Sequence, residues 1–301
     1  MTPRVGPPHS RIPTPPGFVF LASLALTCSA SLASLATLSC SSPQSDELDA
    51  AREALGAGRY HEAIEHYTEV TLQAPESPEA AQALYDVGLI HYLRRRDLDS
   101  ARSTFRKILS SYPESDVARD ARRLLARMYE QDLGEPEKAI REYELLLESE
   151  TDPGERKTLL TRIANCRYEM DDMEGAAEAY RRVVEDSPRE EESVGAYLRL
   201  AHIQRLAGRA DEALENLEAV LGFSEEQDSR RKAYYAMAEV LAEQGRFADA
   251  KSCLTAASEE FAGDDEIAAL VSRIDDQVEE RRRAESGEAP DQQVRWGRGR
   301  P

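Results

Sequence analysis

Residues 51–67 read AREALGAGRYHEAIEHY. A small residue, Ala51, is followed twelve positions later by a second one, Ala63, and the bulky Tyr67 stands four positions after that. The turn-forming stretch Gly58–Tyr60 lies between the two alanines. Small side chains on two helices let their axes approach closely, and a bulky residue one helical turn further on fills the remaining space. The segment therefore predicts a hairpin of two helices.

The same pattern recurs along the chain. The second small residue and its bulky partner are Ala63/Tyr67, Ala101/Phe105, Ala139/Tyr143, Ala176/Tyr180, Ala213/Leu217 and Ala250/Leu254, with alanines 38, 38, 37, 37 and 37 residues apart. Twelve or thirteen positions upstream of each alanine stand Ala51, Gly88, Ala126, Ala164, Ala201 and Ala238. One hairpin cannot bury its apolar face alone, so consecutive hairpins are expected to stack. The pattern predicts an all-α solenoid of six hairpins over residues 47–262.

On these residues the chain resembles the tetratricopeptide repeat family, which places Ala-x3-Phe on the second helix of each repeat and a small residue on the first. The resemblance covers roughly residues 46–262 and implies a right-handed solenoid whose first helices line a concave surface. The chain departs from the family in lacking its first-helix Trp and in a period about three or four residues longer than usual.

The longer period and Tyr-Pro endings such as Ser111–Ser115 resemble outer-membrane-assembly lipoproteins of the BamD type. They resemble equally the Tol-Pal-associated coordinator CpoB, also called YbgF. The stretches 54–64 and 91–101 carry this likeness best, and the second of them has a turn that is one residue longer. The resemblance implies a role in the bacterial cell envelope.

Composition excludes several classes of protein. The 301 residues include 57 acids and 38 bases, for a net charge of -19, and the mean hydropathy is -0.58. A polytopic membrane protein would be less polar, and a nucleic-acid binder would rarely be so acidic, because phosphate contacts dominate its affinity. A hydrophobic content of 41% is too high for a wholly disordered chain.

The N-terminus predicts export. Arg4 and Arg11 precede an apolar run, and no further charged residue occurs before Asp46. This order is typical of a secretory signal, and its end at Cys40 resembles a bacterial lipoprotein signal. We expect a signal peptide over residues 1–39, lipidation of Cys40 at the periplasmic face of the outer membrane, and a tether over 40–46. Cleavage after Ala36, which would release a soluble periplasmic protein, and an uncleaved N-terminal helix remain alternatives.

The C-terminal segment predicts a cap and a tail. Asp264, Asp265 and Glu266 would begin a last helix within residues 263–286 that covers the open end of the solenoid. Residues 287–301 lose the periodicity and are expected to be disordered.

We expect no enzyme activity, no cofactor and no metal, since the chain lacks a recognisable catalytic motif. His61 and His66 are five residues apart, whereas a helical zinc site needs a spacing of four. Cys166 and Cys253 are expected to be buried small hydrophobes. Glu137/Arg141 and Glu178/Arg182 have the i, i+4 spacing of helical ion pairs.

What remains is binding of a protein or peptide partner along the first helices. The residues expected to face inward are rich in Tyr and Arg, which often anchor interfaces; they are Tyr85, Leu89, Tyr92, Arg123, Arg127, Asn165, Tyr168, His202, Arg205 and Tyr235. The alternative is that these side chains cover helix surfaces and pair with nearby acids. Arg123 and Arg127 are one helical turn apart, so they could hold one carboxylate or phosphate together.

These features predict a non-enzymatic scaffold in a cell-envelope complex, with outer-membrane protein assembly as the first interpretation. A Tol-Pal, cell-division or peptidoglycan-linked role is the second, and a cytosolic co-chaperone is the third. The partner and the oligomeric state do not follow from the residues.

Overall fold

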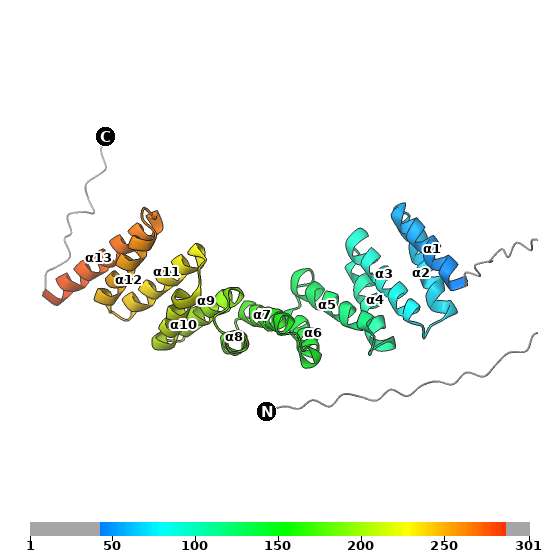
Figure 1. Ribbon diagram of the computed structural model, residues 1–301, viewed down its shortest axis with the longest axis horizontal. Helices are drawn as coiled ribbons and strands as arrows, with labels where there is room; N and C mark the ends of the chain where they lie inside the picture. The colour runs from blue at the N-terminus through cyan, green and yellow to red at the C-terminus, as the bar shows by residue number, and fades with distance from the viewer. Residues whose placement is uncertain (1–42, 287–301) are drawn as a thin grey trace, which may run out of the picture. The chain divides into compact units, whose positions relative to one another are not determined.

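The computed structural model describes residues 43–286, which form thirteen α-helices and no strand (Figure 1). The first helices of the six hairpins are α1 (Pro43–Gly56), α3 (Pro78–Leu89), α5 (Asp116–Gln131), α7 (Pro153–Glu169), α9 (Val194–Leu206) and α11 (Gln227–Glu243). The second helices are α2 (Tyr60–Gln73), α4 (Leu98–Ser111), α6 (Pro136–Ser149), α8 (Met173–Asp186), α10 (Ala210–Phe223) and α12 (Phe247–Glu260). Each helix packs on the next along the chain. The predicted all-α solenoid is confirmed, and α1 begins four residues before the expected boundary at 47.

Capping residues at the connections between repeats set where several first helices begin. The Ser77 hydroxyl accepts a hydrogen bond from the amide of Ala80, and Pro78 occupies the first position of α3. Ser115 caps α5 and Asp152 caps α7 in the same way. These polar caps satisfy amides that have no partner inside the helix.

One residue with a positive φ angle lies in the turn inside every hairpin: Gly58, Arg96, Gly134, Asp171, Gly208 and Gly245. In the second and third repeats, the turn is closed by a backbone hydrogen bond between residues six positions apart. The amide of Asp97 donates to the carbonyl of His91, and the amide of Glu135 donates to the carbonyl of Tyr129. The other four repeats close over five residues, which accounts for the two longer spacings. The extra residue of the second repeat widens its first helix into the short π-helix η1 (Ile90–Arg94).

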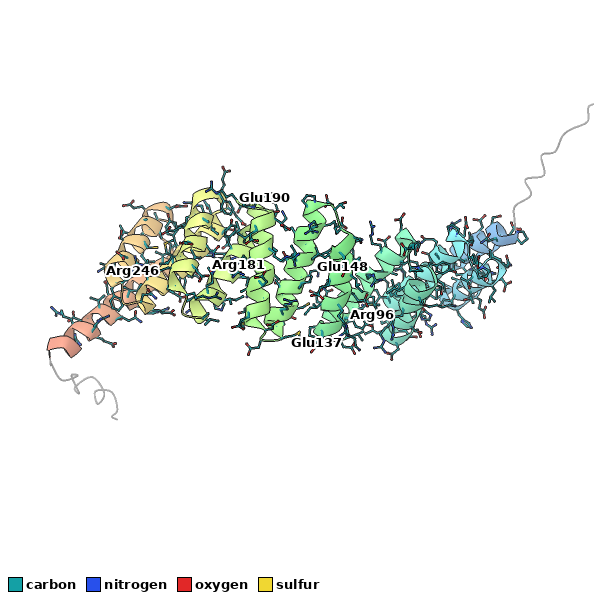
Figure 2. All side chains as sticks on the ribbon, turned by 90° about the horizontal axis from the view of Figure 1, so that it is seen from below. Arg96, Glu137, Glu148, Arg181, Glu190 and Arg246 are labelled. Atoms are coloured by element: carbon teal, nitrogen blue, oxygen red, sulfur yellow. The ribbon has the colours of Figure 1, made fainter. Side chains whose placement is uncertain are left out.

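The turns inside repeats and the connections between them lie on opposite edges of the array. Figure 2 shows Glu137, at the start of α6 just after the turn of the third repeat, on one edge. Glu190 lies on the other edge (Figure 2), just before the short 3-10 helix η2 (Glu191–Ser193) that leads into α9. Both edges carry exposed charged side chains. The two helical faces between the edges are the larger surfaces on which a partner could bind.

The core follows the predicted pattern. The second-helix alanines of all six repeats have an exposed fraction of 0%, and their bulky partners are at most 2% exposed. The small residues on the first helices are also buried. Small-to-large packing inside each hairpin therefore holds the fold together, as the spacing predicted.

The last helix, α13 (Asp265–Ser286), packs against α12 and covers the end of the array. Ile267, Leu270 and Ile274 are 2%, 2% and 1% exposed. The Asp264 carboxylate accepts bonds from the amides of Glu266 and Ile267, so it caps this helix. The predicted capping helix is present and begins at Asp265.

Three expectations concern residues that the structure does not describe: the signal peptide, lipidation of Cys40, and the C-terminal tail over 287–301. Within residues 43–286, no helix combines the length and the apolar character needed to cross a bilayer.

Candidate functional site

The ten residues expected to face inward all lie on first helices or on η1, from α3 to α11. Two pairs of first helices from neighbouring repeats touch, α3 with α5 and α9 with α11, and no two successive second helices touch to the same extent. The first helices therefore form the more closely spaced face of the array. We call this face the inner face.

Several of the expected residues connect one repeat to the next. The Tyr92 hydroxyl donates a hydrogen bond of 2.7 Å to Oδ2 of Asp132 at the end of α5. Arg205 of α9 forms an ion pair with Glu243 of α11. The Tyr168 and His202 rings have centroids 6.4 Å apart. These side chains hold neighbouring repeats in register, which is the alternative role considered for this set.

Others of the set pack within their own repeat. The Tyr85 ring lies against Phe105 with centroids 6.0 Å apart, and burial raises the pKa of its phenol. The Asn165 side chain is exposed, but its Oδ1 accepts a 2.5 Å bond from the Tyr180 hydroxyl. Leu89 and Tyr235 are partly buried against the core. None of these four offers an unoccupied charged group.

A cluster of aromatic and basic side chains lies between α7 and α9. The Arg199 guanidinium stands 5.1 Å from the centroid of the Tyr168 ring. His202 lies beside that ring, and its pKa is lowered by burial first and then by the charges of Arg205 and Arg199. The imidazole is therefore kept neutral near neutral pH. Arg205 is paired with Glu243, so Arg199 is the arginine of this cluster that forms no ion pair with a residue in the range 43–283.

A second group of basic side chains lines a hollow of about 210 Å³ between α5 and α7. The lining residues are Arg123, Arg127, Tyr143, Glu155, Thr158, Leu159 and Arg162. Arg123 contacts Asp120 at 3.1 Å and Glu155 at 3.4 Å. Arg162 contacts Oε2 of Glu130 at 2.9 Å. Arg127 is exposed and makes no ion pair with any residue in the range 43–283. We call this the α5–α7 hollow.

Arg127 also lies near the end of α3. Burial raises the pKa of the Tyr92 phenol, and the charge of Arg127 acts in the opposite direction. The guanidinium is thus close enough to Tyr92 to affect its ionisation. Arg127 therefore lies both at the α5–α7 hollow and near Tyr92 of the preceding repeat.

A buried network supports the hollow from below. The Tyr143 hydroxyl donates a 2.6 Å bond to Oε2 of Glu130, the same oxygen that Arg162 contacts. Burial, followed by this carboxylate, raises the pKa of Tyr143. The periodicity of the sequence does not predict this network. The signal for it was a buried Tyr hydroxyl on the second helix, which needs a polar partner.

The remaining expectations concern reactive groups. Burial raises the pKa of Cys166 to about 12 and of Cys253 to about 11, and Cys253 is only partly buried. His66 contacts Glu47 at 2.7 Å, while His61 is exposed. The structure shows no cluster of three His, Cys, Asp or Glu residues suited to a metal ion anywhere in residues 43–286.

Family models described as tetratricopeptide repeat match most of the repeat region. One model matches residues 48–116 and 92–155, a second matches 159–189, and a third matches 204–274. Together these matches cover more than half of the chain. No curated protein matches the sequence significantly.

Solved structures resemble the chain in fold. The structure of Naa15/Naa10 bound to HypK-THB matches 82% of this chain and 37% of that chain, with 16% identity and a TM-score of 0.58. YrrB, a TPR protein with an unusual peptide-binding site, matches 70% of this chain and 100% of that chain, with 16% identity and a TM-score of 0.49. A tetratricopeptide repeat protein from Parabacteroides merdae matches 83% and 95%, with 19% identity and a TM-score of 0.45. At such identities the likeness is one of fold alone.

Proposed function

The chain belongs to the tetratricopeptide repeat family, and we propose that it acts as a non-enzymatic scaffold that binds a protein or peptide partner on its inner face. Stacked helical repeats present an extended surface, and such surfaces hold partners by contact over many residues.

The observation that carries this proposal is the state of Arg127. It is exposed at the α5–α7 hollow and has no ion pair in the described part of the chain, while Arg123 and Arg162 beside it are paired. The chain has 57 acids for 38 bases, so an arginine left without a carboxylate is available to one from outside.

The partner segment presents a carboxylate, either on an acidic side chain or at a C-terminus. Arg127 binds this carboxylate first, because it has no intramolecular partner to give up. Arg123 adds a second set of donors by exchanging Glu155, whose contact at 3.4 Å is the longer of its two. A planar guanidinium can make two parallel bonds to a carboxylate, which gives the contact its orientation.

A crosslinking pull-down from native membranes tests the proposal. Arg123→Glu/Arg127→Glu removes both donors and repels a carboxylate, so the main partner should be lost. Arg182→Glu/Arg189→Glu is the matched control, because both residues are exposed and belong to α8 or the loop after it. Recovery of the same partner with the inner-face variant would contradict the proposal.

We place this scaffold at the periplasmic face of the bacterial outer membrane, anchored by a lipid on Cys40. This part of the proposal is supported by the sequence of residues 1–40. Cys40→Ala should block processing and remove the protein from the outer-membrane fraction. Unchanged processing and unchanged fractionation would contradict the lipid anchor.

Within the envelope, assembly of outer-membrane proteins is our first proposal and a Tol-Pal or peptidoglycan-linked role is the second. The identity of the crosslinked partner separates them. A β-barrel assembly factor supports the first, and a Tol-Pal component supports the second. A cytoplasmic partner, together with uncleaved soluble protein, would argue against both.

A further inference from the structure

A second hollow lies away from the inner face, between the second helices of the second and third repeats. Its volume is about 410 Å³, and its lining residues are Arg102 and Arg106 of α4, Tyr129 of α5, and Lys138, Arg141 and Glu142 of α6. Four of these six side chains are bases and one is an acid. We call this the α4–α6 hollow.

The lone acid of the hollow is already engaged. Glu142 contacts Nη1 of Arg122 at 2.8 Å, so it does not neutralise the bases around the hollow. Arg102 and Lys138 are paired with Asp99 at 2.6 Å and Glu135 at 2.7 Å. Arg106 and Arg141 make no ion pair with any residue in the range 43–283. The expected pair of Glu137 with Arg141 is therefore wrong, and Glu178 likewise pairs with Arg181 instead of Arg182.

The positive charge continues from the hollow along α4. A neighbouring depression of about 500 Å³ is lined by Asp99, Arg102, Ser103, Arg106, Lys107 and Ser110. Lys107 is also exposed and without an ion pair in residues 43–283. The chain as a whole has a net charge of -19, so this basic surface is opposite in sign to the rest of the protein.

Two of the bases, Lys138 and Arg141, stand at positions where other repeats have acids. One residue before the core alanine and two residues after it, the first repeat has Glu62 and Glu65, and the fifth has Glu212 and Glu215. The third repeat has Lys138 and Arg141 at the same two positions. The core alanines of these repeats are buried alike, so packing inside the hairpin does not require this change of charge.

Arg106 shows the same contrast with its counterpart five residues after the core alanine of the fourth repeat, Arg181. Arg181 is neutralised by Glu178, three residues before it. In the second repeat that position is Ser103, and no acid lies three or four residues from Arg106 in either direction along α4. As a result, one guanidinium on each side of the α4–α6 hollow has no ion pair within residues 43–283.

We propose that the α4–α6 hollow is a binding site for a phosphate-type anion that carries two or more negative charges. Arg106 and Arg141 each offer a planar set of N–H donors to its oxygens, from α4 and from α6. Lys138 also lines the hollow, with its ammonium group 5.5 Å from the centroid of the Tyr129 ring and paired with Glu135. The site uses second helices and is separate from the inner-face function proposed above.

Titration of the full-length protein with inorganic pyrophosphate tests this site. Arg106→Gln/Arg141→Gln should weaken binding at least about tenfold, since each arginine contributes charge-assisted hydrogen bonds. Arg182→Gln/Arg189→Gln is the matched control: it removes the same charge from exposed positions of the fourth repeat and should leave binding unchanged.

The phosphate-type group could belong to a soluble ligand or to a lipid headgroup, and a second arm separates them. Vesicles of phosphatidylglycerol are compared with vesicles of phosphatidylcholine, with the same three proteins. If the double variant binds only pyrophosphate more weakly than the wild type, the source is a soluble ligand; if it binds the anionic vesicles more weakly, with or without a loss of pyrophosphate binding, the source is a lipid headgroup. If neither probe binds, or if the control variant loses binding as much as the double variant, the site does not exist as proposed.

Discussion

The ring of Phe105 occupies the space where a side chain at Gly88 would lie. A Cβ atom added to Gly88 would stand 2.5 Å from Cε1 of Phe105 and 2.9 Å from Cδ1. Phe105 is fully buried, so its ring has no room to retreat. The closest approach of the two helices of the second repeat therefore depends on the absence of a side chain at this one position.

In Gly88→Ala, the added methyl group overpacks a filled core at a cost of about 1 to 3 kcal/mol. The better helix propensity of Ala offsets about 1 kcal/mol of this cost, so the variant should be less stable by up to about 2 kcal/mol. Gly195→Ala in α9 is the control, since nothing lies within 4 Å of its added Cβ, and it should be neutral or slightly stabilising. Chemical denaturation measures both. Equal stability of the two variants would contradict the packing described for Gly88.

Disrupting the cap should loosen only one end of the solenoid. Ile274 is 1% exposed in the contact of α13 with the last repeat, and Ile274→Ala should cost about 2 to 4 kcal/mol locally. Each repeat touches mainly its neighbours, so the loss should spread little. Hydrogen exchange should become faster in α11 to α13 and stay unchanged in α1 to α4. A uniform increase over all repeats would show that the array unfolds as a single unit.

His91 should make the fold sensitive to mild acid. Burial lowers its pKa below the ordinary value of 6.5, and this effect exceeds the opposite effect of Asp97. The unfolded chain therefore takes up the proton more readily, so stability is present above about pH 6.5 and is lost as the pH falls. His91→Gln should reduce the fall in melting temperature between about pH 7.5 and about pH 5.5. His202, whose pKa is lowered too, should preserve part of that fall. An unchanged fall in the variant would contradict this role.

The repeating part of the fold was predictable from the sequence, because every hairpin has the same spacing of small and bulky residues. Ala63 with Tyr67 and Ala139 with Tyr143 are buried pairs in the structure, as their spacing requires. Even the longer turn of the second repeat was visible as one extra residue before Ala101. The π-helix itself was not predictable, because the spacing shows that one residue is added but not which backbone conformation accommodates it.

The candidate site was predictable only to the level of a helix face. Periodicity places Arg123, Arg127 and Arg205 on the first helices, but it does not say which acid one repeat away each will meet. Arg205 meets Glu243, whereas Arg127 meets none in the described residues. The buried contact of Arg162 with Glu130 joins residues 32 positions apart, so it depends on the stacking of repeats and has no local signature.

Photo-crosslinking at position 158 tests the central claim most directly. A photoreactive amino acid replaces Thr158, which lines the α5–α7 hollow beside Arg127, and in a second strain it replaces Arg182 on α8. Both positions are exposed, and the probe at position 158 leaves Arg123 and Arg127 in place. We expect one dominant protein adduct from position 158 that is absent from position 182. The same adducts from both positions, or none from position 158, would contradict binding of a partner on the inner face.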